Sequence, residues 1–236
     1  MKLDAAELAS RLQYDLEVVS ELRSPALGEI RAYASDDDWR AGRRLDASNT
    51  GERQATVYVV DYSFPVLVSA AETTPKVTVH FDLLAGGNYP YTAPWTAAVS
   101  RPTPWSPHVH PNEATVCIGE IWRDARGKML LADLIVHVMR ILNFDETERG
   151  LEYGGWNSAA INHWRRVLKR KPLHPDLAYP VLPTHLTHGM PEPDCSFSPV
   201  SCDETLSGFA PSSPSTQRRI AIEDVLGDAF TPIRTR

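Results

Sequence analysis

Residues 76–84, KVTVHFDLL, alternate apolar and polar side chains and constrain the fold more than any other stretch. Alternate side chains of a strand point to opposite faces, so one face would carry Val77, Val79, Phe81 and Leu83 and the other Lys76, Thr78, His80 and Asp82. Similar stretches, rich in valine and aromatic residues, lie at 28–34, 55–64 and 94–100. Four successive strands without intervening helices predict an antiparallel meander.

Helical spacing of apolar residues flanks this predicted sheet on both sides. It runs over residues 4–23, where Ser24-Pro25 ends it, and returns over 129–142 and 156–170. The apolar face predicted for the middle helix consists of Leu130, Leu131, Leu134, Ile135, Val138, Ile141 and Leu142. Helix, meander and later helices together predict an α+β fold.

The C-terminal part of the chain differs from the rest in composition. Of the nineteen prolines in 236 residues, ten fall after residue 170, among many serines and threonines. We therefore expect one folded domain at 1–170, followed by a Pro/Ser-rich extension at 171–236 that is extended or partly docked on the domain. Within the extension, residues 218–230 have the pattern of a short amphipathic helix that docks on the body or on a partner.

Charge and hydropathy exclude several classes of function. A net charge of −6 gives no general attraction to nucleic acid, so we expect no nucleic-acid partner. No run of 18 apolar residues occurs and the first residues lack an apolar signal core, which predicts neither a membrane span nor a signal peptide. Three unevenly spaced cysteines do not form a disulfide framework and favour a reducing, cytoplasmic location.

The stretch HVHPNEATVCIGEIW, residues 108–122, concentrates reactive side chains in a predicted irregular segment, 101–128. His108, His110 and Cys117 are zinc-ligand types, but no CxxC, HxE or second ligand pair accompanies them. A second group of ligand types lies in the extension, at His185, His188, Cys195 and Cys202, with spacings that match no metal motif. We therefore predict no metal and no cofactor.

Nucleophilic catalysis is the other chemistry open to Cys117. A thiolate is a strong nucleophile and a good leaving group, so a partly exposed cysteine carries acyl groups as thioesters. A cysteine protease would also need a base and an orienting residue, and none of the known local signatures surrounds Cys117. The remaining alternative is a buried loop cysteine that acts as a small apolar side chain.

The order of elements around Cys117 resembles the ubiquitin-conjugating enzyme family over about residues 4–170. The shared features are an opening helix, a four-strand meander, Tyr89-Pro90 with Pro94 before the fourth strand, His110-Pro111-Asn112, Thr115-Val116-Cys117-Ile118, Trp122 and two later helices. The resemblance implies a ubiquitin-conjugating-like fold and an acyltransferase. It would accept a ubiquitin-like protein from an activating enzyme as a thioester on Cys117 and pass it to an amine of a target protein.

The resemblance also implies roles for individual residues. Cys117 would form the thioester, and the amide of Asn112 would bind the oxyanion that develops during amine attack. His110 and Pro111 would hold the shape of the active-site loop. The candidate gate acids, which would orient or deprotonate the amine, are Asp145, Glu146 and Glu148. The opening helix would contribute to docking the activating enzyme, with a polar face made acidic by Asp15, Glu17 and Glu21.

Some features depart from the common members of the family. Only four residues separate Asn112 from Cys117, no Trp-x-Pro follows the cysteine, and a long segment, 35–53, joins the first two strands. This shortened form resembles bacterial members encoded in conjugation operons, often tied to defence against phage. Two alternatives stay open: a non-catalytic ubiquitin-conjugating-like module that binds a ubiquitin-like partner, and a cysteine hydrolase on an unrelated α+β scaffold.

Overall fold

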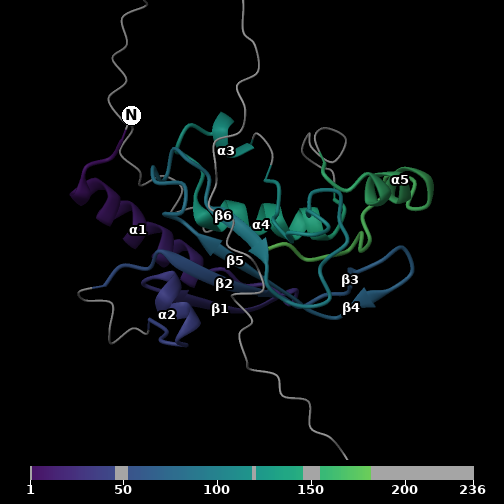
Figure 1. The fold of residues 1–236 in the computed structure, drawn as a ribbon, viewed down its shortest axis with the longest axis horizontal. Helices are drawn as coiled ribbons and strands as arrows, with labels where there is room; N and C mark the ends of the chain where they lie inside the picture. The colour runs from purple at the N-terminus through teal and green to yellow at the C-terminus, as the bar shows by residue number, and fades with distance from the viewer. Residues whose placement is uncertain (1, 46–52, 119–120, 146–154, 182–236) are drawn as a thin grey trace, which may run out of the picture. The chain divides into compact units, whose positions relative to one another are not determined.

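The computed structural model describes residues 2–45, 53–118, 121–145 and 155–181. By its internal contacts the chain divides into Met1–Thr187 and His188–Arg236, and the second unit lies wholly outside the described residues. The first unit has an N-terminal helix, a four-stranded antiparallel sheet and later helices, as Figure 1 shows. The predicted α+β class is thus confirmed.

The sheet is a meander in which each strand pairs with the next one predicted from the sequence. Its strands are β1 (Leu27–Tyr33), β2 (Val57–Tyr62), β5 (Val77–Asp82) and β6 (Trp95–Ala98), in the spatial order β1-β2-β5-β6. All neighbouring pairs are antiparallel. Val79 pairs with Val60 on one side and Ala98 on the other, so apolar side chains of three strands fall on one face.

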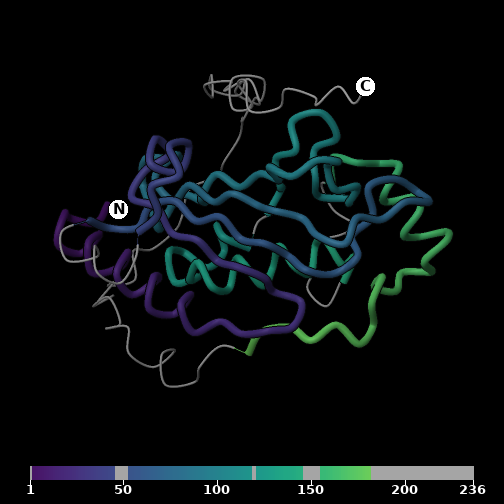
Figure 2. The backbone as a smooth tube through the Cα atoms, turned by 90° about the horizontal axis from the view of Figure 1, so that it is seen from below, coloured from purple at the N-terminus to yellow at the C-terminus, as the bar shows by residue number. Residues whose placement is uncertain are grey.

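That inner face packs against helix α4 (Leu131–Leu142), with α1 (Ala5–Ser20) beside it. Figure 2 shows both helices on one side of the strands. All the apolar residues predicted to face inward from β5 and α4 are buried. The Tyr62 hydroxyl donates a hydrogen bond to the Ile135 carbonyl at 3.0 Å, which satisfies the one polar atom that this ring brings into the core.

The outer face of the sheet is covered in part by α2 (Asp36–Arg40), a short helix in the segment that joins β1 and β2. Trp39 packs on Tyr33, Val57 and Val59, and its ring lies 4.2 Å from that of His80. His80 was predicted on a polar face but is only 1% exposed, because this helix covers it. Its Nε2 lies 3.3 Å from the Asp36 carboxylate, and this contact lowers the pKa of Asp36.

Four short elements were not predicted. One is α2, and the others are β3 (Val66–Leu67) and β4 (Thr73–Thr74), which form a hairpin, and α3 (Ile121–Asp124), which lies in the segment expected to be irregular. Elements of two to five residues are too short to show a period in the sequence. The carbonyl of Leu67 accepts a hydrogen bond from the Trp105 amide at 2.7 Å and so holds the chain where it enters the Cys117 region.

Helix α1 contributes a buried ionic network that its sequence did not reveal. Asp15 was assigned to the polar face of this helix, but it is completely buried. Its carboxylate accepts hydrogen bonds from Arg11 at 2.8 Å, from the Tyr89 hydroxyl at 2.5 Å and from the amide of Leu131 at 2.9 Å. Burial raises the pKa of Tyr89 well above its usual range, so its hydroxyl stays a donor. Arg11 also donates to the Gly127 carbonyl at 2.7 Å.

The first residues of the predicted extension pack against the body of the protein. Beyond α5 (Ser158–Arg166), the segment 171–181 returns along the helices, drawn in green in Figure 2. Asn143, 1% exposed at the end of α4, holds it. Its side chain accepts from the His174 amide at 2.9 Å and donates to the His174 carbonyl at 3.1 Å and the Tyr179 hydroxyl at 2.9 Å.

We expect Asn143→Ala to release this segment. The change removes three hydrogen bonds and leaves partly buried backbone groups of His174 without their partner, at a cost of about 2–3 kcal/mol. Chemical denaturation measures the lost stability, and hydrogen exchange should show faster exchange of the His174 amide. The exposed Asn112→Ala is the matched control and should leave both unchanged. Unaltered protection of His174 in Asn143→Ala would contradict the role given to Asn143.

Among the described residues, no helix combines the length and the apolar character needed to span a bilayer. The amphipathic segment predicted at 218–230 lies outside the described residues.

Candidate functional site

Residues 108–117 form a small hairpin that continues the sheet beyond β6. The Ala98 amide donates to the Ala114 carbonyl at 2.9 Å, and the Val116 amide donates to the Thr96 carbonyl at 2.8 Å. The returning arm then pairs with residues 108–110, where Val109 lies opposite Val116. The segment predicted to be an irregular active-site loop is therefore held to the sheet by backbone hydrogen bonds.

The tip of this hairpin carries the His-Pro-Asn triplet. The His110 amide donates to the Thr115 carbonyl at 2.8 Å, and the Ala114 amide donates back to the His110 carbonyl at 2.9 Å. Ala114 closes the turn with a left-handed φ of 56°. Pro111 and Asn112 project from the tip and are exposed. The four residues between Asn112 and Cys117 are thus enough to complete a tight turn.

Cys117 lies on the returning arm, two residues beyond Thr115. It is a free cysteine with a partly exposed side chain, between two buried neighbours, Val116 and Ile118. Its amide donates to the His108 carbonyl at 2.7 Å, which fixes the backbone under the thiol. At about 3.3 Å per residue, its Cα lies about 7 Å along the strand from Thr115. The incidental buried thiol considered from the sequence does not match this exposure.

The hairpin register places His108 directly opposite Cys117, because Val109 pairs with Val116. Opposed residues of an antiparallel pair have Cβ atoms about 5 Å apart. His108 is 4% exposed. The sequence analysis considered this histidine only as a zinc ligand or as a protease base. A nine-residue spacing gives no sign of cross-strand opposition unless the turn between the two residues is known.

His110 holds the shape of the tip. Its Nδ1 accepts a hydrogen bond from the Glu113 amide at 3.1 Å, so in the neutral ring the proton is on Nε2. The ring contacts that of Trp156 edge to face, with 5.6 Å between centroids. Both contacts agree with the predicted loop-shaping role, and the Nδ1 lone pair is already used.

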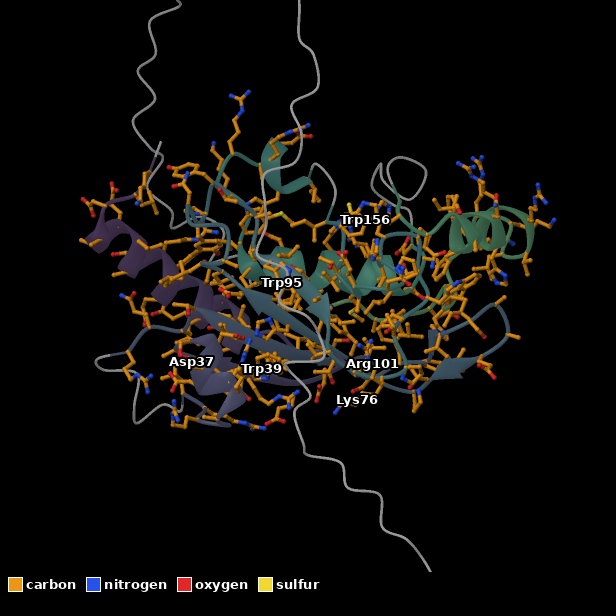
Figure 3. The ribbon with its side chains drawn as sticks, viewed as in Figure 1. Asp37, Trp39, Lys76, Trp95, Arg101 and Trp156 are labelled. Carbon is orange, nitrogen blue, oxygen red and sulfur yellow. The ribbon has the colours of Figure 1, made fainter. Side chains whose placement is uncertain are left out.

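Trp156 comes from the segment between α4 and α5 and was not identified from the sequence. It is 47% exposed, although the backbone on either side is closely packed. The Asn157 amide donates to the Pro107 carbonyl at 3.1 Å. A Cβ at Gly155 would lie 2.8 Å from that same carbonyl oxygen, so only glycine fits there. The exposed indole, labelled in Figure 3, thus contacts the hairpin through the His110 ring.

Of the three candidate gate acids, the structure describes only Asp145. Asp145 hydrogen-bonds the Tyr179 hydroxyl, which also accepts from Asn143. Burial is the main cause that raises the pKa of Tyr179, and its hydroxyl therefore remains a donor to this carboxylate. The structure thus joins Asp145 to the C-terminal segment 171–181. Glu146 and Glu148 lie outside the described residues.

In the described part of the chain, no group of three or more histidine, cysteine, aspartate or glutamate side chains is arranged to hold a metal ion. His108, His110 and Cys117 are included in that part. The second group of ligand types, from His185 to Cys202, lies outside it. The described site is a partly exposed thiol on a hairpin whose tip carries His110 and Asn112, with the Trp156 indole against His110.

No protein-family model matches this sequence, and no curated protein matches it either.

Proposed function

We propose that the protein is a ubiquitin-like-protein conjugating enzyme with a ubiquitin-conjugating-like fold and Cys117 as its acyl carrier. The observation that carries the proposal is the position of Cys117. It is a partly exposed thiol on a hairpin that continues the last strand of a four-stranded meander and has His-Pro-Asn at its tip. An N-terminal helix precedes this arrangement, and in the described part of the chain the short α3 and the longer α4 and α5 follow it.

The proposed chemistry consists of two acyl transfers. The Cys117 thiolate attacks the thioester on an activating enzyme, so a new S–C bond forms and the enzyme's thiol leaves. The neutral amine of a target then attacks the Cys117 thioester. An N–C bond forms, the C–S bond breaks, the thiolate departs with its electron pair, and the amine loses a proton to solvent. The products are an amide and the free thiol, and no oxidant is required.

The direct test is thioester formation. The protein is incubated with an activating enzyme, ATP and a ubiquitin-like protein, and the products are separated with and without a reducing agent. We expect an adduct that forms only with ATP and is lost on reduction. A fully loaded activating enzyme that transfers nothing to the wild-type protein would contradict the proposal and favour the non-catalytic binding module.

Asn112→Ala tests the second step separately. The exposed Asn112 sits at the hairpin tip, and its amide is the candidate donor to the oxyanion that forms when the amine attacks. We expect thioester loading to stay within twofold of wild type and transfer to amine to slow by about 10²-fold. Single-turnover discharge of the preloaded thioester measures this. Equal transfer rates in the two proteins would remove Asn112 from the chemistry.

One observation favours a second candidate, a cysteine hydrolase: His108 lies opposite Cys117 in the hairpin register. A histidine at that distance is a candidate base for a thiol nucleophile. This candidate predicts release of a peptide or ester product without ATP, and His108→Ala would abolish that release. The bacterial operon setting and the role in phage defence rest on the family resemblance alone and are part of the proposal.

A further inference from the structure

We infer that Trp156 is the specificity-determining residue for the acceptor, and that its indole binds the side chain of an incoming lysine. The inference rests on the proposed function, because it concerns the second acyl transfer. It assigns a substrate class, a primary amine on a flexible aliphatic stem, to a residue that the sequence did not identify.

The first support is that Trp156 has an exposed side chain on a closely packed backbone. Trp156 is 47% exposed, and tryptophan, with its large apolar ring, is enriched at interfaces. The backbone around it is fixed by the bond from Asn157 to Pro107 and by the close approach of Gly155 to the same carbonyl. The backbone that carries the indole is therefore held in place, which lowers the cost of ordering this site when a ligand binds.

The second support is the contact between Trp156 and His110. The Trp156 ring contacts His110 at 5.6 Å, and the His110 ring is itself fixed by the Glu113 amide. His110 pairs with Thr115, on the arm that carries Cys117 two residues further on. A chain of contacts thus runs from the indole to the hairpin that holds the thiol.

The chemistry of the indole selects the ligand. Its face attracts an ammonium group and packs against methylene groups, the two parts of a lysine side chain. The predicted acid in this region that the structure describes, Asp145, is hydrogen-bonded to Tyr179. The indole would therefore attract the cation through its ring face, independently of Asp145. After binding, the amine releases its proton to water before it attacks the thioester.

The test uses the full-length protein loaded with modifier, isolated from the activating enzyme, and follows discharge against the concentration of free lysine. Wild type, Trp156→Ala, Trp156→Phe and Val167→Ala are compared. Val167 is a matched control because it is an apolar residue, 62% exposed, on the neighbouring helix end. Hydroxylamine, a small nucleophile without a stem or a cation at neutral pH, is the second acceptor.

We expect Trp156→Ala to raise the lysine concentration for half-maximal discharge by about fivefold, with the maximal rate within twofold of wild type. Trp156→Phe should restore most of the loss, and Val167→Ala should match wild type. Loading and discharge to hydroxylamine should be unchanged in all variants. Equal lysine dependence in Trp156→Ala and wild type would overturn the inference, as would an equal slowing with hydroxylamine, which would indicate a loosened hairpin. Failure of wild type to load would instead overturn the proposed function and the inference together.

Discussion

Cys117→Ala is expected to abolish the reductant-labile adduct completely, with no loss of fold. The side chain is partly exposed and makes no hydrogen bond that the structure records, so its removal costs little stability. The Cys117 backbone stays anchored by its amide bond to His108. Loss of the thiol removes the only group on this hairpin that can carry an acyl chain as a thioester.

Cys117→Ser tests whether the adduct at position 117 requires a thiol. Cys117→Ser should give either no adduct or an oxygen ester that survives reduction, because a hydroxyl is a poorer nucleophile than a thiolate near neutral pH. The matched controls are Cys195→Ser and Cys202→Ser, which change the other two cysteines and should leave the labile adduct intact. A labile adduct in Cys117→Ser that disappears in one of these controls would transfer the catalytic role to that cysteine.

Asp15→Ala is expected to destabilise the fold strongly, with a loss of about 3–5 kcal/mol in the free energy of unfolding. The completely buried carboxylate accepts from Arg11, Tyr89 and the first amide of α4. Its removal leaves a buried guanidinium without a counter-charge and a buried hydroxyl without an acceptor. Denaturant unfolding measures the loss, and the variant should also load thioester poorly because α4 and the Tyr89 loop lose their attachment to α1.

Glu17→Ala is the control for Asp15→Ala, because it removes an acid from the same helix at an exposed position that bonds only Gln13 across one turn. Its cost should stay within about 0.5 kcal/mol. Tyr89→Phe should fall between the two, at about 1–3 kcal/mol. Equal costs for Asp15→Ala and Glu17→Ala would show that the network contributes no more than a surface pair.

The strands and main helices were predictable because the side chains that face the core are apolar, and so apolar residues recur with the period of a strand or a helix. In β5, the three apolar residues alternate with polar ones, and all three are buried. Asp15 and His80 were misplaced for a common reason. A charged or polar side chain is assigned to solvent by its own chemistry, whereas its burial depends on distant residues, Tyr89 for the first and Trp39 for the second.

The candidate site was predictable where its residues are close in sequence. The triplet His110-Pro111-Asn112 and Cys117 lie within eight positions, and the structure places them in one hairpin. Trp156 was not predictable, because it reaches this hairpin only through the packing of Gly155 and Asn157 on Pro107. The opposition of His108 and Cys117 also depends on a turn that Ala114 closes with an unusual φ.

The attachment of the 108–117 hairpin to β6 has a consequence for solubility. An uncovered edge strand presents unpaired amide and carbonyl groups, which recruit strands from other molecules and lead to aggregation. Here the returning arm of the hairpin occupies that position through its bonds to Ala98 and Thr96. The segment that carries Cys117 therefore also protects the sheet. A deletion that removed Cys117 with its hairpin arm would therefore also leave the backbone groups of β6 unpaired and open to other chains.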